Sequence, residues 1–112
     1  MTRGVRGILE RMKETIIQAK ILKYLHSQGY LAFRVNNGAI WDARLKQYRT
    51  HVGMKGVPDI ICVIKGKFHG IEVKKEKGGK QSPEQFIFQQ RLEEAGGVYI
   101  SARSVEDVAE KL

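Results

Sequence analysis

Residues 58–74, PDIICVIKGKFHGIEVK, decide the fold because they describe one β-hairpin. Pro58 fixes the backbone where the chain enters it. The β-branched run at 59–64 predicts a strand, and Lys65-Gly66-Lys67 predicts a tight turn. The alternating residues at 68–74 predict the returning strand. The stretch therefore forms two paired strands of one sheet.

The chemistry of this hairpin resides in Asp59, Glu72 and Lys74. Side chains alternate between the faces of a strand, so Glu72 and Lys74 share one face, while Ile71 and Val73 share the other. Pairing of the strands can bring the Asp59 carboxylate beside that of Glu72. Two close carboxylates repel unless a cation lies between them.

Mg²⁺ is such a cation, because this hard ion uses one or two protein carboxylates together with water and phosphate. Lys74 would flank the ion, where it can hold an attacking water and stabilise charge on a phosphate. An ordinary solvated sheet edge would show the same Glu-x-Lys spacing. The Pro-Asp pair at hairpin distance, a glycine-rich lead-in and a basic chain favour the metal site.

The rest of the chain predicts a helix, strands, a helix, a strand and a last helix, without linkers or repeats. Together they predict a single α/β domain over 1–112, with a mixed sheet flanked by helices. The expected elements are a helix at 12–28, a strand at 30–35, a loop with a short exposed hairpin within 36–52, a turn-rich loop at 53–58, a charged loop at 75–81, a helix from Ser82-Pro83 to near Gly96-Gly97, a strand at 98–102, and a short helix capped by Ser104 with Asp107 in a capping box.

Charge is distributed unevenly. The chain has 20 Lys and Arg against 12 Asp and Glu, a net charge of +8. Residues 1–80 hold 17 basic and 6 acidic residues, whereas 81–112 hold 3 basic and 6 acidic ones. A basic body favours a polyanionic partner, most often nucleic acid, although solubility alone is the simpler explanation. No apolar run approaches the roughly 18 residues of a membrane span, so we expect no membrane partner.

The chain has one cysteine, Cys62, which excludes an intrachain disulfide and fits a reducing, cytoplasmic location. Cys62 lies within an apolar run, which predicts a buried and inert thiol. The first residues are charged and lack the apolar segment of a signal peptide.

These residues resemble the PD-(D/E)xK nuclease superfamily, and more narrowly its virus-type replication-repair nuclease (VRR-NUC) family in the small stand-alone viral form. The resemblance covers nearly the whole chain and shows no departure at the motif positions. The segment 39–50 is less standard. The matching segments are the N-terminal helix with Glu14, Arg34-x-Asn36-Asn37-Gly38, Gly53-x-x-Gly56-x-Pro58-Asp59, Ile71-Glu72-Val73-Lys74, Ser82-Pro83-Glu84-Gln85 and Gly97-Val98-Tyr99-Ile100.

The resemblance implies a restriction-endonuclease-like fold with an α-β-β-β-α-β core. It implies that Asp59, Glu72 and the Val73 carbonyl bind Mg²⁺ or Mn²⁺, and that Lys74 orients or activates the hydrolytic water. Glu14, as a further metal ligand and catalytic residue, and Gln85 would complete the site from two helices. No small-molecule cofactor is implied. A viral member would act in the cytoplasm of its bacterial host.

Glu14 and Gln85 each have a second interpretation. Glu14 shares a helical stripe with Ile21 and Leu25, but an acidic residue in a frayed first turn would simply suit the helix dipole. Gln85 lies three residues after Ser82, which matches a capping box. It also shares a stripe with apolar residues of its helix and therefore faces inward.

For DNA contact we expect the basic and polar residues that flank the motif, which would meet phosphates without reading sequence. Trp41 can stack on an unpaired base, and a core or dimer-interface tryptophan is an equal alternative. The three histidines do not form a zinc pattern. The candidate DNA-binding residues are Arg34, Asn36, Asn37, Trp41, Arg44, Lys46, Arg49, Lys55, Lys75, Lys77 and Lys80.

The sequence thus predicts a Mg²⁺- or Mn²⁺-dependent DNA endonuclease. The resemblance implies branched DNA such as a Holliday junction, cut by a homodimer, because symmetric cleavage of two strands needs two sites. The same chemistry on flaps, nicked duplex or single strands is one alternative. A non-catalytic DNA-binding module is another, although such a module usually loses a carboxylate or the lysine.

Overall fold

The predicted hairpin forms the centre of a four-stranded sheet. The computed structural model describes residues 3–35, 40–49 and 54–112. In it β4 (Ile60–Ile64) pairs antiparallel with β5 (Lys67–Val73), and Ile60 lies opposite Ile71. The turn consists of Lys65 and Gly66, both with positive φ, which is the backbone of a tight hairpin turn.

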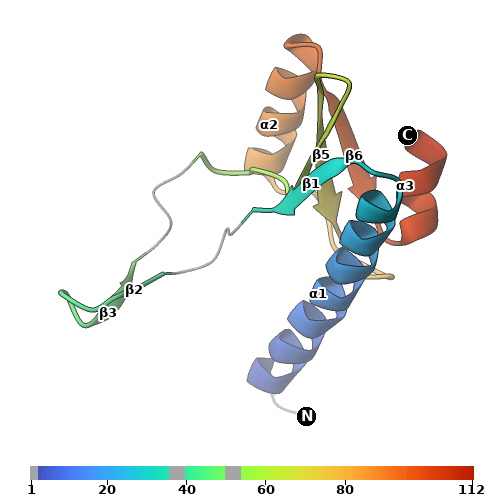
Figure 1. Cartoon of the computed structure of the whole chain (residues 1–112). Helices are drawn as coiled ribbons and strands as arrows, with labels where there is room; N and C mark the ends of the chain where they lie inside the picture. Colours follow the sequence, from blue (N-terminus) through green and yellow to red (C-terminus); the bar gives the residue numbers. More distant parts are fainter. Residues whose placement is uncertain (1–2, 36–39, 50–53) are drawn as a thin grey trace.

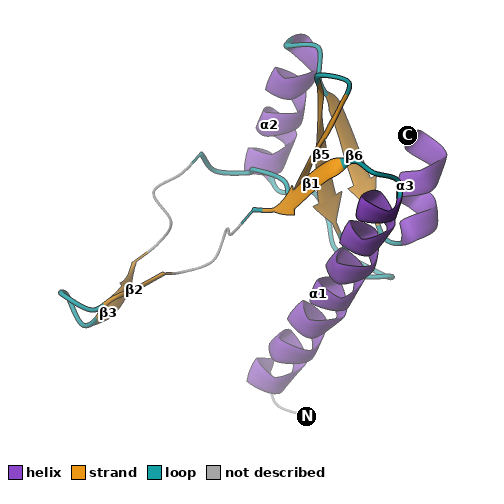
Figure 2. Cartoon of the chain, viewed as in Figure 1, coloured by secondary structure: helices purple, strands orange, loops and turns teal. Residues whose placement is uncertain are grey.

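The sheet is mixed, as predicted (Figure 2). Its strand order is β1-β4-β5-β6. β1 (Leu31–Arg34) pairs antiparallel with β4, whereas β6 (Val98–Ala102) pairs parallel with β5. A parallel pair needs a crossover connection, and the helix between β5 and β6 provides it.

Three helices flank this sheet (Figure 1). They are α1 (Arg3–Ser27), α2 (Pro83–Glu94) and α3 (Val105–Lys111). α1 and α3 lie against one face, whose core contains Ile21, Leu25 and Val108. α2 lies on the other face beside β6. The element order matches the predicted α-β-β-β-α-β core, with a further hairpin and a last helix.

Alternation along β5 separates the core from the polar face. Ile71 and Val73 are buried among the apolar residues under α1, together with Ile60 and Cys62. Glu72 points to the opposite face, towards α2. The predicted burial of Cys62 is therefore confirmed.

The first helix is longer than predicted, because it begins at Arg3 and not at residue 12. Its C-terminal half packs on the sheet, but Ile8, Met12 and Ile16 are more than half exposed. Two early glycines obscured this start, since glycine disfavours helix.

A separate hairpin interrupts the chain between β1 and β4. β2 (Ile40–Asp42) and β3 (Gln47–Arg49) form a two-stranded sheet of their own, away from the four-stranded sheet in Figure 1. Asp42 Oδ1 accepts hydrogen bonds from the amides of Arg44 and Leu45 in its turn. The short hairpin predicted within 36–52 is confirmed at these described residues.

Both predicted helix caps are present, but one differs in detail. Ser82 Oγ accepts from the Gln85 amide, and Ser104 Oγ accepts from the Asp107 amide. Asp107 accepts from the amide of Arg103, so the reciprocal bond of a full capping box is shifted by one residue. Within the described residues, no helix has the length and apolar character needed to cross a membrane.

Candidate active site

Asp59 and Val73 join the two central strands at one end of the hairpin. Asp59 comes one residue before β4, and Asp59 Oδ2 accepts a 2.8 Å hydrogen bond from the Val73 amide. Its carbonyl accepts from Val35, which extends the pairing with β1. The preceding Pro58 is fully buried, with its ring against Gly70 of β5. The strand ends therefore fix the Asp59 carboxylate beside β5.

Glu72 is buried on the polar face and only partly satisfied. Its relative exposure is 6%, and Glu72 Oε1 accepts a 2.8 Å hydrogen bond from Gln85 Nε2. Glu72 Oε2 is buried, and no hydrogen-bond partner for it lies within the described part of the chain. An unsatisfied buried carboxylate oxygen is costly, which makes it a natural position for a cation.

Lys74 lies two residues further along and faces the same side, as alternation predicts. Lys74 Nζ is 3.8 Å from Glu72 Oε1 and donates to Gln85 Oε1 at 3.0 Å. It also lies 3.4 Å from the carbonyl of Lys80. Its side chain is only 13% exposed, so the ammonium is held near the carboxylates and not extended into solvent.

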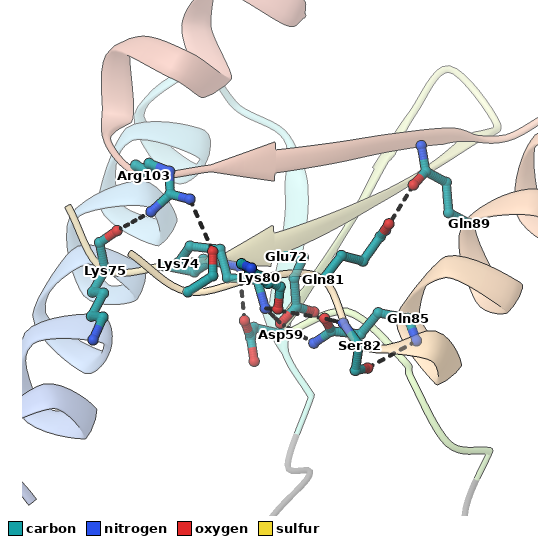
Figure 3. A network of polar contacts seen from close by, with 12 residues as sticks. Asp59, Glu72, Lys74, Lys75, Lys80, Gln81, Ser82, Gln85, Gln89 and Arg103 are labelled. Carbon is teal, nitrogen blue, oxygen red and sulfur yellow. Dashed lines mark hydrogen bonds and ion pairs between the residues drawn. The ribbon is translucent and has the colours of Figure 1, made fainter. Parts of the chain in front are cut away.

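Gln85 both completes a helix cap and contacts Glu72 and Lys74 (Figure 3). Gln85 Oε1 accepts from the Ser82 amide at 2.9 Å, which completes the capping box of α2. The same amide group binds Glu72 through its nitrogen and Lys74 through its oxygen. The helix cap therefore orients a side chain that bridges the carboxylate and the ammonium.

Burial and like charge dominate the electrostatics of the pair. Burial, followed by the negative charge of Asp59, raises the pKa of Glu72 to about 8, and Lys74 opposes this shift. Burial also raises the pKa of Asp59, against the hydrogen bond from Val73. A divalent cation between two such carboxylates would offset both costs.

Glu14 lies within α1 and not in its first turn, because the helix starts at Arg3. The frayed-turn explanation is therefore excluded. Its side chain is half-buried, and its negative charge adds to the raised pKa of Glu72. Glu14 thus belongs to the electrostatic surroundings of the pair, from a helix far away in sequence.

The donor set resembles that expected for magnesium. No group of three His, Cys, Asp or Glu side chains gathers within 3–35, 40–49 and 54–112. A metal here would rest on the Asp59 and Glu72 carboxylates, which is the number that Mg²⁺ commonly uses. The remaining ligands would be water, phosphate and backbone, for which the family resemblance implies the Val73 carbonyl.

The structure places five of the candidate DNA-binding residues on or next to the four-stranded sheet. Arg34 ends β1, and its positive charge opposes the burial that raises the pKa of Asp59, so it lies near the pair. Lys55 precedes β4 and is exposed. Lys75, Lys77 and Lys80 lie on the loop after β5; Lys75 Nζ is 2.7 Å from Glu10 Oε1, so its charge is already partly neutralised.

The remaining candidates are on the separate hairpin or cannot be placed. Arg44 and Lys46 are exposed in its turn. Arg49 is in β3, and Trp41 is in β2 opposite Tyr48. The side chains of Arg49 and Trp41, and all of Asn36 and Asn37, lie outside the described residues, so both interpretations of Trp41 stay predictions.

The described histidines bind backbone. His69 Nδ1 is 3.0 Å from the carbonyl of Lys67, and His26 Nε2 is 2.9 Å from that of Ala32. His51 lies outside the described residues.

The sequence prediction assigned no role to three features of the site. Arg103 hydrogen-bonds the loop after Lys74. Tyr99 places a buried hydroxyl in a cavity of about 240 Å³ that Glu72 and Lys74 also line. Gly56, with φ of +80°, lies so close to α2 that an added Cβ would be 2.2 Å from the carbonyl of Glu84. Of these three, only Gly56 had a signal in the sequence, because it belongs to the Gly-x-Pro-Asp pattern.

Comparison with known proteins supports the fold. The chain is similar to a solved structure described as a VRR_NUC domain, with a TM-score of 0.66 and 21% sequence identity. The similarity covers 88% of this chain and 91% of that one. No protein-family model and no curated protein sequence matches the chain. The chain therefore has the fold of a VRR_NUC domain, as the motifs predicted.

Proposed function

We propose that this protein is a divalent-metal-dependent DNA nuclease that hydrolyses phosphodiester bonds. One observation carries the proposal. The half-buried carboxylate of Asp59 and the buried carboxylate of Glu72 lie beside Lys74, and no donor among the described residues satisfies one of the Glu72 oxygens. The fold of a VRR_NUC domain and the basic chain are consistent with it.

Each residue has a distinct task in this proposal. Asp59 and Glu72 would hold Mg²⁺ or Mn²⁺, with Glu14 adding negative charge from α1. When bound, the ion supplies Lewis-acid polarisation of the scissile phosphate and makes water more acidic. Lys74 would hold the attacking water and stabilise the negative charge that develops on the phosphate. Gln85 keeps the Lys74 ammonium and the Glu72 carboxylate in place.

The basic test is cleavage of end-labelled DNA by purified protein with Mg²⁺, Mn²⁺ or EDTA. We expect metal-dependent cleavage that Asp59→Asn abolishes. Isothermal titration with Mn²⁺ should show binding that weakens in the same variant. Wild-type protein that neither cuts any DNA nor binds the metal through Asp59 would refute the proposal. Metal-independent DNA binding alone would identify a binding module.

We further propose branched DNA as the substrate and a homodimer as the active form, both of which rest on the family resemblance. Two symmetric cuts in a four-way junction require two sites, and one chain offers one. A panel of junction, flap, nicked, duplex and single-stranded DNA at equal concentration tests the substrate. A preference for flaps or single strands would contradict the junction as substrate. Light scattering that shows a monomer at working concentrations would contradict the homodimer.

A further inference from the structure

Arg103 connects the C-terminal part of the fold to the loop that follows Lys74. It lies between β6 and α3, and its amide donates to Asp107 Oδ2 at 2.8 Å. Arg103 Nη1 donates to the carbonyls of Lys75, at 2.7 Å, and of Gly78. Arg103 Nη2 donates to the carbonyl of Gly79 at 3.2 Å. One planar fork thus gathers three carbonyls of a six-residue loop, and Figure 3 shows Arg103 beside Lys75.

This loop, residues 75–80, contacts the candidate active site at both ends. It begins directly after Lys74, and the Lys80 carbonyl lies 3.4 Å from Lys74 Nζ. It leads into the cap of α2, from which Gln85 contacts Glu72. The backbone course of 75–80 therefore influences where the Lys74 ammonium rests.

The loop also has the composition of a phosphate-binding segment. It carries Lys75, Lys77 and Lys80, with Glu76 as its only acidic residue. No carboxylate forms an ion pair with the Arg103 guanidinium among the described residues, so its charge adds to theirs. A lysine at 103 would keep this charge but lose the rigid fork that suits several acceptors at once.

We propose that Arg103 is a positioning residue of the nuclease reaction, an inference that rests on the proposed function. Its guanidinium fixes loop 75–80 so that Lys74 is held at the carboxylates and the loop lysines are preorganised for the phosphates beside the scissile bond. Arg103 acts through the loop and touches neither metal nor scissile phosphate. Preorganisation matters because small displacements of catalytic groups are costly in rate.

The test compares Arg103→Lys with Arg103→Ala and with Arg91→Lys, a matched control on exposed α2 surface. We expect Arg103→Lys to lower kcat/KM about tenfold and to raise KM for DNA several-fold. A merely destabilised protein would lose active molecules without a change in KM. Arg91→Lys should match wild type. Retention of wild-type kinetics by Arg103→Lys, with loss only in Arg103→Ala, would show that charge alone matters and overturn the proposal.

Hydrogen exchange separates failure of this inference from failure of the nuclease function, because it needs no activity. We expect amides of 75–80 to exchange faster in Arg103→Lys while those of β4 and β5 stay protected. Unchanged exchange in this loop would overturn the proposal even in an active enzyme.

Gly79→Ala provides a second route if Arg103→Lys folds poorly. Gly79 has φ of +73°, and an added Cβ meets only Lys74 Cδ at 3.7 Å, so the change strains the backbone without a severe clash. We expect it to loosen the loop and raise KM as Arg103→Lys does. The double variant should be no worse than Arg103→Lys, because both act on one element. Wild-type kinetics in Gly79→Ala would contradict this, and so would additive losses in the double variant.

Discussion

Two hairpins of this chain differ in what surrounds them. The β4–β5 hairpin lies at the centre of the four-stranded sheet, with α1 on one face and α2 on the other. The β2–β3 hairpin forms a small sheet of its own. The β2–β3 hairpin holds an ion pair between Asp42 and an exposed Arg44, whereas the β4–β5 hairpin holds Glu72 and Lys74 close together with both side chains largely buried. The comparison teaches that packing on both faces turns a common strand pattern into a candidate active site.

The largest expected effect comes from a carboxylate of the central hairpin. Asp59→Asn keeps the shape of the side chain but removes the charge that would bind the metal. We expect cleavage to fall at least about a thousandfold, with the fold retained by circular dichroism. Glu110→Gln, an exposed carboxylate on α3, is the matched control and should cut normally. Comparable activity in the two variants would place the chemistry elsewhere.

The second effect concerns how closely the loop before β4 approaches α2. Gly56→Ala combines a positive φ with a clash against the Glu84 carbonyl, so we expect a loss of about 2 kcal/mol or more in unfolding free energy. Gly29→Ala has a similar φ of +79° but open space around it, and should lose less. Urea denaturation measures both. Equal losses would mean that the contact with α2 is easily relieved.

The third prediction separates the cap from the site. Gln85→Ala removes contacts to Glu72 and Lys74, and should lower activity about 10- to 100-fold. Ser82→Ala removes only the Oγ acceptor of the cap, and should cost about 1 kcal/mol of stability with activity nearly retained. Similar kinetic losses in both variants would make Gln85 a structural residue alone.

The fourth prediction is a pH dependence that the central hairpin should show. Because the pKa of Glu72 is raised to about 8 in the folded protein, the folded state binds more protons than the unfolded state above the normal carboxyl pKa. The metal-free protein should therefore lose stability as pH rises towards 8, and Glu72→Gln should remove this component. Denaturation curves across this range, with and without Mn²⁺, measure it. An identical pH slope in wild type and variant would contradict the raised pKa.

The smallest effect is expected at the β2–β3 hairpin. Arg44→Ala with Lys46→Ala removes two exposed charges that do not contact the central site. If they contact phosphates, KM for DNA should rise about threefold, with kcat and stability unchanged. The slope of the logarithm of the DNA-binding constant against the logarithm of salt concentration should fall in magnitude by about two. A fall in kcat would show that the two hairpins are coupled. No change in DNA binding would restrict the DNA interface to the main body.

Much of the fold could be predicted because its signals are local. Alternation and a two-residue turn define the central hairpin, and capping serines define the starts of α2 and α3. The start of α1 could not be predicted, because Ile8 and Leu9 of its first turns are largely exposed and give no clear apolar face. Strand alternation and hairpin pairing likewise predict that Asp59, Glu72 and Lys74 occupy adjoining positions of the sheet.

The sequence by itself therefore determined the central hairpin and the charged groups that it presents, since strand period and pairing depend on near neighbours. Only the tertiary structure decided that Gln85 bridges Glu72 and Lys74, that Gly56 touches α2, and that Arg103 holds the loop after β5. These contacts join segments that are separate in sequence. Their geometry depends on how helices pack on the sheet, which no local pattern specifies.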